Sequence, residues 1–328
     1  MESQTIMELE ALTPMELDAG LVFSGVPTGN KIWGYQHPCM YTPAIDPNYS
    51  FHESARDAAV WFMNKLDPLY LYGPTGSGKT SLIKQLAARL NYPVFEVTGH
   101  GRLEFADLCG HISLHEGSMR YEYGPLSLAM RHGGLLLINE VDLLSPEVAV
   151  GLNGVLEGAP LCLPENGGEV IHPHEMFRIA CTGNTNGGGD DTGLYQGTGR
   201  MNLAWLDRFM LCEVYYPDAA VEKSLLLKCH PALPEPVITN MVEFANEIRK
   251  QFIGSSDSYA DTIEVTLSTR TLLRWADLTL RFQPLAHQGI QPLSYALDRA
   301  LGFRASRPTR AMLHELLQRI FPMDCHLG

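Results

Sequence analysis

The sequence lacks long apolar runs and paired cysteines, and each absence excludes a class of protein. No apolar run approaches the roughly 20 residues that cross a bilayer. The opening Met-Glu-Ser-Gln has neither the basic nor the apolar region of a secretory signal. The seven scattered cysteines form no Cys-x-x-Cys pair, which argues against a disulfide framework or a zinc site. We therefore expect a cytoplasmic protein with reduced thiols and no membrane contact.

The chain is also poor in positive charge. It has 24 Lys and Arg residues against 37 Asp and Glu residues, a formal net charge of −13, and no long basic run. Nucleic-acid binders neutralise phosphates with clustered Lys and Arg. Nucleic acid is therefore not expected as the partner, although a local basic surface is still possible. At 328 residues, 45% of them apolar, the chain suits a globular protein with one large and one smaller domain.

What the sequence does contain is an alternation of strand and helix patterns. Short apolar runs predict strands at 68–72, 93–98, 135–138, 178–182 and 211–215, and amphipathic patterns predict helices at 52–64 and 79–90. This alternation is typical of an α/β fold with a mostly parallel sheet. Two hairpins, at 111–123 and 161–171, interrupt it.

After residue 217 only helix patterns remain. They lie at 219–227, 237–252, 270–282, 293–301 and 310–320. The first fifty residues are rich in Pro and Gly and have few periodic apolar positions, so they are interpreted as a draped segment without a core of its own. We therefore expect an N-terminal extension at 1–51, an α/β nucleotide-binding core at 52–216 and a smaller α-helical lid domain at 217–328.

A glycine-rich run lies between the first predicted strand and the helix that follows it. The run consists of Gly73, Pro74, Thr75, Gly76, Ser77, Gly78, Lys79 and Thr80, and fits the Walker A pattern. Its glycines let backbone N–H groups wrap phosphates at the positive end of the helix. We expect ATP as the ligand, with Lys79 reaching the β- and γ-phosphates and Thr80 ligating Mg²⁺.

The strand at 135–138 ends in Asn139 and Glu140, about 60 residues after Lys79, as a Walker B strand should. Glu140 is the candidate that polarises the attacking water. The acid that usually precedes this glutamate, and that orients the magnesium shell, is replaced by Asn139. An amide accepts a hydrogen bond from a metal-bound water but brings no negative charge. Weaker binding of Mg²⁺ or slower hydrolysis would follow. Asp142 is a candidate that would partly substitute for the missing acid.

Four further side chains are candidates for contact with the γ-phosphate. Asn184, at the end of the strand at 178–182, would orient water, although Asn is also a common turn residue. Arg208 precedes the last strand and can project into the nucleotide site of a neighbouring subunit; a surface salt bridge is the alternative. Arg270 and Arg274 share one face of a lid helix, and we favour Arg270 as the contact within the same subunit.

Taken together, these motifs and the helical lid resemble an AAA+ ATPase. The two hairpins lie where the MoxR and chelatase branch of that family carries inserts. Within the branch the chain is most similar to the ATPase subunits of aerobic cobaltochelatase (the CobS type), through residues 42–49, 86–91 and 155–157. The most specific likeness is the run 183–199, which contains Asp-Thr-Gly-Leu-Tyr-Gln-Gly-Thr. The resemblance covers roughly residues 42–228 and departs at Asn139, where the family has Asp.

The resemblance implies an AAA+ P-loop NTPase core with a parallel sheet and a helical lid. It also implies a homo-oligomer, a hexameric ring with ATP between subunits and Arg208 acting in trans, and a partner protein with a von Willebrand A-type domain.

Three functions follow as hypotheses. The first is a ring ATPase that remodels this partner protein. The second is a DNA-acting AAA+ motor or loader, which the acidic balance opposes. The third, suggested by Asn139, is a nucleotide-gated scaffold with little turnover.

Overall fold

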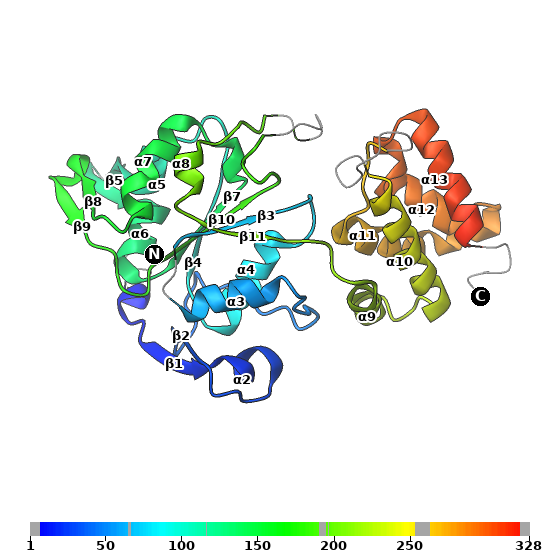
Figure 1. The fold of residues 1–328 in the computed structure, drawn as a ribbon, viewed down its shortest axis with the longest axis horizontal. Helices are drawn as coiled ribbons and strands as arrows, with labels where there is room; N and C mark the ends of the chain where they lie inside the picture. Colours follow the sequence, from blue (N-terminus) through cyan, green and yellow to red (C-terminus); the bar gives the residue numbers. More distant parts are fainter. Residues whose placement is uncertain are drawn as a thin grey trace.

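A five-stranded parallel sheet lies at the centre of the larger part of the molecule (Figure 1). The computed structural model describes residues 7–64, 67–115, 117–189, 195, 197–252 and 263–321. In the order β11-β3-β10-β7-β4, the strands are β11 (Met210–Glu213), β3 (Leu69–Tyr72), β10 (Arg178–Gly183), β7 (Leu135–Asn139) and β4 (Val94–Thr98). All neighbouring pairs are parallel, which confirms the predicted α/β fold. The carboxyl ends of these strands share one edge, where ligands of such sheets bind.

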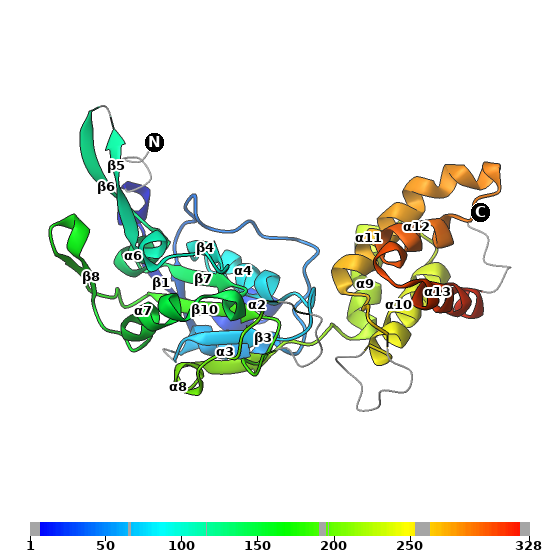
Figure 2. The ribbon, with the colours of Figure 1, turned by 90° about the horizontal axis from the view of Figure 1, so that it is seen from above.

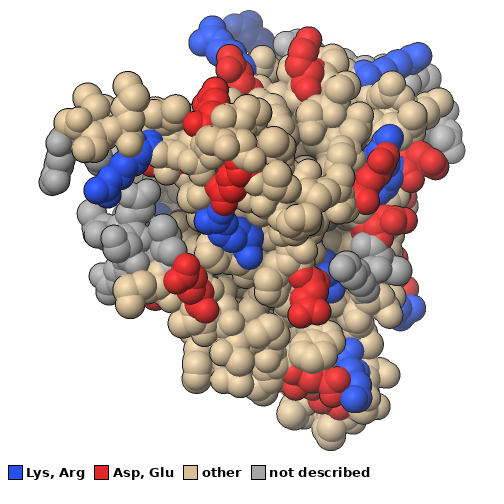
Figure 3. Space-filling model, turned by 90° about the vertical axis from the view of Figure 1, so that its left-hand side faces the viewer, with Lys and Arg blue, Asp and Glu red and all other residues tan. Residues whose placement is uncertain are grey.

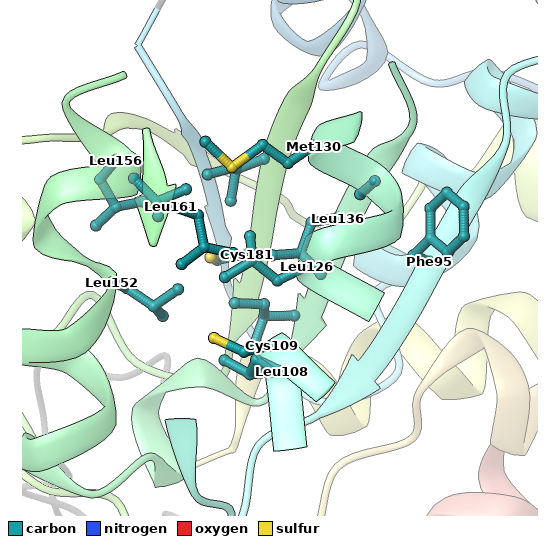
Figure 4. Packing of buried hydrophobic residues seen from close by; sticks show 14 of the residues in the cluster. Phe95, Leu108, Cys109, Leu126, Met130, Leu136, Leu152, Leu156, Leu161 and Cys181 are labelled. Atoms are coloured by element: carbon teal, nitrogen blue, oxygen red, sulfur yellow. The ribbon is translucent and has the colours of Figure 1, made fainter. Parts of the chain in front are cut away.

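Alternate residues of the central strand β7 enter two different cores, because successive side chains of a strand point to opposite faces. Leu135 and Leu137 belong to one cluster, and Leu136 and Ile138 to the other. Figure 4 shows part of the cluster that contains Leu136. The first cluster packs against α3 (Ala55–Met63) and α4 (Lys79–Arg89), and the second against α5 (Phe105–Cys109), α6 (Pro125–His132) and α7 (Pro146–Leu156). Helices thus cover both faces, which explains the continuous apolar run in the sequence.

The first fifty residues are more ordered than the sequence predicted. β1 (Pro14–Asp18) and β2 (Lys31–Tyr35) form an antiparallel hairpin joined through α2 (Ala19–Ser24). Ile32 and Tyr35 are buried in the cluster of α3 and α4, and the Tyr35 hydroxyl donates to the Gly133 carbonyl oxygen at 2.8 Å. The segment therefore contributes to the core of the sheet domain. The sequence pattern did not reveal the two strands because few of their residues are apolar and buried.

Both predicted hairpins are present. They are β5 (Gly110–His115) with β6 (Ser118–Tyr123), and β8 (Leu161–Leu163) with β9 (Glu169–Ile171). Figure 2 shows both at the end of the sheet domain that faces away from the C-terminal helices.

The C-terminal helices form a second body with a core of its own (Figure 1). Their bounds are α9 (Ala219–Cys229), α10 (Glu235–Lys250), α11 (Thr269–Phe282), α12 (Pro292–Ala300) and α13 (Arg307–Ile320). Trp275 of α11 is fully buried and packs on Phe244 of α10, with ring centroids 5.1 Å apart. Among the described residues, every helix is too short or too polar to cross a membrane.

A buried ion pair within the helical body lies against Tyr216, whose hydroxyl contacts the glycine-rich loop. Arg249 donates to Glu222 at 2.7 and 2.8 Å, and Glu222 is completely buried. The Arg249 guanidinium lies 4.3 Å from the centre of the Tyr216 ring, and the Tyr216 hydroxyl donates to the Thr75 carbonyl oxygen at 2.9 Å. These contacts fix the helical body next to the loop.

Candidate functional site

The glycine-rich run forms the loop between β3 and α4, and its backbone needs glycine at two tight positions. Gly73 has φ 146°, and a Cβ there would lie 2.2 Å from the Val214 carbonyl oxygen. Gly76 has φ 70°, and its Cβ would lie 2.5 Å from the Ser268 Cβ. The Ser77 hydroxyl is buried with no hydrogen-bond partner among the described residues. An unsatisfied buried hydroxyl in such a loop fits a cradle built for a polar ligand.

Lys79 begins α4 and is only 8% exposed. Its Nζ donates to the carbonyl oxygens of Gly73 at 2.8 Å and Pro74 at 2.9 Å, and to Asn184 Oδ1 at 3.2 Å. Burial lowers the pKa of Lys79 to about 8, against the opposing effect of the Asp142 and Glu140 carboxylates. Neutral oxygens thus hold an ammonium group for which a phosphate is the stronger acceptor.

The side chain of Asn139 closes a hydrogen-bond network at the end of β7. Its Oδ1 accepts from Thr80 Oγ1 at 2.7 Å and from Thr182 Oγ1 at 3.1 Å. Its Nδ2 donates to Glu96 Oε1 at 2.8 Å. Glu96 lies on the neighbouring strand β4, and the sequence analysis did not select it. The Thr80 hydroxyl is therefore part of this network. Thr80 is the residue whose side chain was predicted to hold Mg²⁺.

Glu140 follows Asn139 and has an unusual backbone conformation. Its φ of 53° and ψ of 46° lie in the left-handed region, which few non-glycine residues adopt. Such conformations gather at functional sites, where the surrounding fold maintains them. Glu140 is exposed and lines the same cleft as Lys79.

Asp142 is bonded to the turn that follows β10. Its Oδ2 accepts hydrogen bonds from the backbone N–H groups of Asn184 at 2.8 Å and Thr185 at 3.1 Å, and the residue is 3% exposed. Asp142 thus fixes the turn that carries Asn184 beside Lys79. Its partial substitution for the missing acid stays a prediction, since one carboxylate oxygen is engaged by the turn and Oδ1 is buried with no partner among the described residues.

The two lid arginines occupy different surroundings. Ser268 caps α11 by accepting from the Thr271 N–H at 3.2 Å, and Arg270 in the first turn lines the cleft. Arg270 is close enough to Lys79 to lower its pKa further. Arg274, one turn later, lies instead near Arg304, whose pKa is lowered mainly by burial and also by Arg274.

Arg208 lies in an ion pair within its own subunit. Its Nε donates to Glu157 Oε1 at 2.7 Å, and its Nη1 donates to the Ala204 carbonyl oxygen. The Glu157 side chain is 57% exposed. This contact is the salt bridge considered as the alternative for Arg208, and a role in a neighbouring subunit stays a prediction.

These elements surround a cleft of about 670 Å³, a size typical of small-molecule sites. The glycine-rich loop forms part of its lining. Tyr49 and His52 also line the cleft, and the Tyr49 hydroxyl and His52 Nε2 are buried with no partner in the described part of the chain. Apolar Val221 and Leu225 of α9 add to the lining. The loop suits phosphates, and the mixture of polar and apolar groups suits a flat heterocycle with polar edges.

Comparison with known proteins matches both parts of the chain. Residues 68–201 match the AAA domain of the dynein-related subfamily. Residues 222–320 match the C-terminal domain of CbbQ, NirQ and NorQ.

Two curated relatives and one solved structure illustrate the similarity. The chain is 27% identical over 333 residues to the aerobic cobaltochelatase subunit CobS of a Sinorhizobium species, covering 99% of this chain and 96% of that protein. It is 29% identical over 261 residues to Midasin of Dictyostelium discoideum, covering 79% of this chain and 4% of Midasin. A solved mutant of RuvB from Thermotoga maritima is 15% identical, with a TM-score of 0.48, covering 76% of this chain and 71% of that one.

Proposed function

We propose that this chain, which matches AAA-domain and CbbQ-type family models, is a MoxR and CobS-like AAA+ ATPase that hydrolyses ATP in a ring to remodel a partner protein. The observation that carries the proposal is the gathering of Lys79, Asn139, Glu140, Asn184 and Arg270 around one cleft. We propose a hexameric ring and a partner with a von Willebrand A-type domain. The similarity to CobS, a subunit of a larger enzyme by its name, supports a role among other proteins.

ATP fits the cleft in one orientation. The triphosphate lies against the loop, where Lys79 exchanges its carbonyl partners for phosphate oxygens and the Ser77 hydroxyl gains a partner. We place the base beside Tyr49 and His52 and the apolar side chains of α9, which line the same cleft. ATP would then satisfy polar atoms that are otherwise buried without a partner.

Hydrolysis needs a water activated beside the γ-phosphate. Glu140 accepts a proton from this water while the water oxygen attacks the γ-phosphorus. The bond between the γ-phosphorus and the bridging oxygen of the β-phosphate breaks, and ADP leaves. Asn184, fixed by Asp142 and bonded to Lys79, orients the water. Arg270 and Lys79 stabilise the charge on the transferred phosphoryl group. Thr80 would hold Mg²⁺ through its hydroxyl, and the ion would add positive charge that stabilises the phosphate oxygens.

Lys79 gives ATP binding a defined pH dependence. Burial holds its pKa at about 8 in the free protein, and a bound triphosphate raises that pKa because it favours the charged form. At pH 7 the lysine is already charged, whereas at pH 8.5 binding must take up more than about half a proton per ATP. Affinity therefore falls as the pH rises above 8. Calorimetry in buffers of different ionisation enthalpy measures the uptake.

The control for this measurement is Lys79→Arg. A guanidinium stays charged across this pH range, so the variant should show no additional uptake at pH 8.5. Equal proton uptake by the wild-type protein at pH 7 and pH 8.5 would contradict the assignment of Lys79.

The DNA-acting alternative has little support from charge. The net charge is −13, and on the face drawn in Figure 3 blue and red side chains are interspersed without a continuous basic patch. The scaffold alternative is favoured by one observation, the neutral Asn139 at the position of the usual acid.

Phosphate release from ATP tests the three functions together. The proposal predicts magnesium-dependent release that Lys79→Ala abolishes and that a von Willebrand A-type partner protein changes. Release that depends on DNA, and weakens steeply with salt, would favour the DNA motor. Tight ATP binding without measurable release would favour the scaffold.

A further inference from the structure

Glu96 lies on β4 beside the magnesium end of the cleft, although it belongs to none of the nucleotide motifs. The register pairs Thr98 of β4 with Asn139 of β7, and Glu96 lines the same cleft as Thr80 and Asn139. Its Oε1 accepts from Asn139 Nδ2 at 2.8 Å. Its Oε2 accepts from Lys84 Nζ at 2.7 Å. A carboxylate is thus fixed one side chain away from the position where the related ATPases have an acid.

This contact determines which way the Asn139 amide faces. A carboxylate only accepts hydrogen bonds, so the amide nitrogen must face Glu96 and the amide oxygen must face Thr80 and Thr182. The Thr80 hydroxyl then donates its proton to Asn139 Oδ1. Its lone pairs remain free for a cation, as they would be beside an aspartate.

We propose that Glu96 supplies the negative charge that Asn139 lacks and positions Asn139 for the Mg²⁺ that accompanies ATP. The proposal rests on the proposed function. Glu96 is a positioning residue. It acts by holding the Asn139 amide and by the electrostatic attraction of its negative charge for the cation. Residues behind metal ligands typically change metal affinity by 10- to 100-fold. Because Lys84 is paired with Glu96 and the carboxylate is 37% exposed, we expect the lower end of that range.

The test is the affinity for a fluorescent ATP analogue, titrated once with Mg²⁺ and once with EDTA. Glu96→Gln keeps an oxygen that accepts from Asn139 but loses the charge. It should weaken binding with Mg²⁺ by roughly tenfold and leave binding in EDTA unchanged. Glu96→Ala, which also releases the amide, should weaken it further. Glu16→Gln, a carboxylate paired with Lys31 at 2.9 Å on β1, is the matched control and should change neither affinity.

The N139D substitution tests whether the charge of Glu96 replaces the charge of an acid at position 139. In the N139D background the cleft has its own carboxylate, so Glu96→Gln should cost less than about threefold there. In the metal-free protein N139D alone should lower Tm, because two carboxylates would face each other across the 2.8 Å contact. Adding Glu96→Gln should restore Tm.

The possible results distinguish a failure of the role of Glu96 from a failure of the proposed ATPase function. If Glu96→Gln has wild-type affinity with Mg²⁺, or costs the same factor in the wild-type and N139D backgrounds, the role of Glu96 is overturned while ATP binding stands. If the wild-type protein binds the analogue in neither condition, both proposals are overturned.

Discussion

Glu140→Gln is expected to lower the rate of ATP hydrolysis by roughly 10²- to 10⁴-fold and to leave ATP affinity nearly unchanged. The reason is that Gln has the shape of Glu but does not accept the proton of the attacking water. Lys79, Ser77 and the loop amides, which hold the triphosphate, are untouched. Steady-state phosphate release and equilibrium binding of labelled ATP measure the two quantities separately.

The matched control is Glu147→Gln, a carboxylate on the exposed side of the first turn of α7. It should hydrolyse ATP at the wild-type rate. If Glu140→Gln also hydrolyses ATP at the wild-type rate, Glu140 is not the base, and its left-handed backbone needs another explanation.

Arg208→Ala is expected to lower turnover in the assembled ring by about 10³-fold or more, the range measured for arginines supplied to a neighbouring nucleotide site. Nucleotide binding by the single subunit should not change, because Arg208 is bonded to Glu157 and Ala204 in its own subunit. Glu157→Ala separates the two possible roles. An exposed ion pair contributes only about 0.2–1 kcal/mol, so this variant should keep most of its activity.

Mixed rings test whether Arg208 acts across the interface. Lys79→Ala subunits lack a working nucleotide site but still present Arg208, and Arg208→Ala subunits keep the site. Mixing two inactive preparations should therefore restore hydrolysis. Absence of any rescue in rings that contain both subunits, or equal losses in Arg208→Ala and Glu157→Ala, would assign Arg208 to the surface salt bridge alone.

The parts that the sequence predicted well are those in which chemistry and local structure coincide. The glycine-rich loop is one contiguous run between a strand and a helix, so its position follows directly from the pattern. Strand β7 is predictable because burial on both faces makes it apolar throughout. Helix periodicity placed Arg270 and Arg274 on one face of a lid helix, and of these two Arg270 lines the cleft.

The parts that the sequence missed depend on contacts between distant segments. Glu96 approaches Asn139 only because β4 is the neighbour of β7 in the sheet, and strand order is not contained in either motif. Asp142 bonds through one carboxylate oxygen to the turn after β10, a contact that no local pattern contains. Tyr49 reaches the cleft from a segment without a periodic pattern, and His52 from the start of the predicted helix at 52–64.

The central claim is that the loop before α4 holds a triphosphate whose terminal phosphate faces Glu140. The most direct measurement is an experimental structure of the Glu140→Gln variant with ATP and Mg²⁺. We predict the γ-phosphate within hydrogen-bond reach of Lys79, with room for one water between it and the side chain at position 140. A triphosphate bound elsewhere, or a position 140 too distant for one bridging water, would contradict the account.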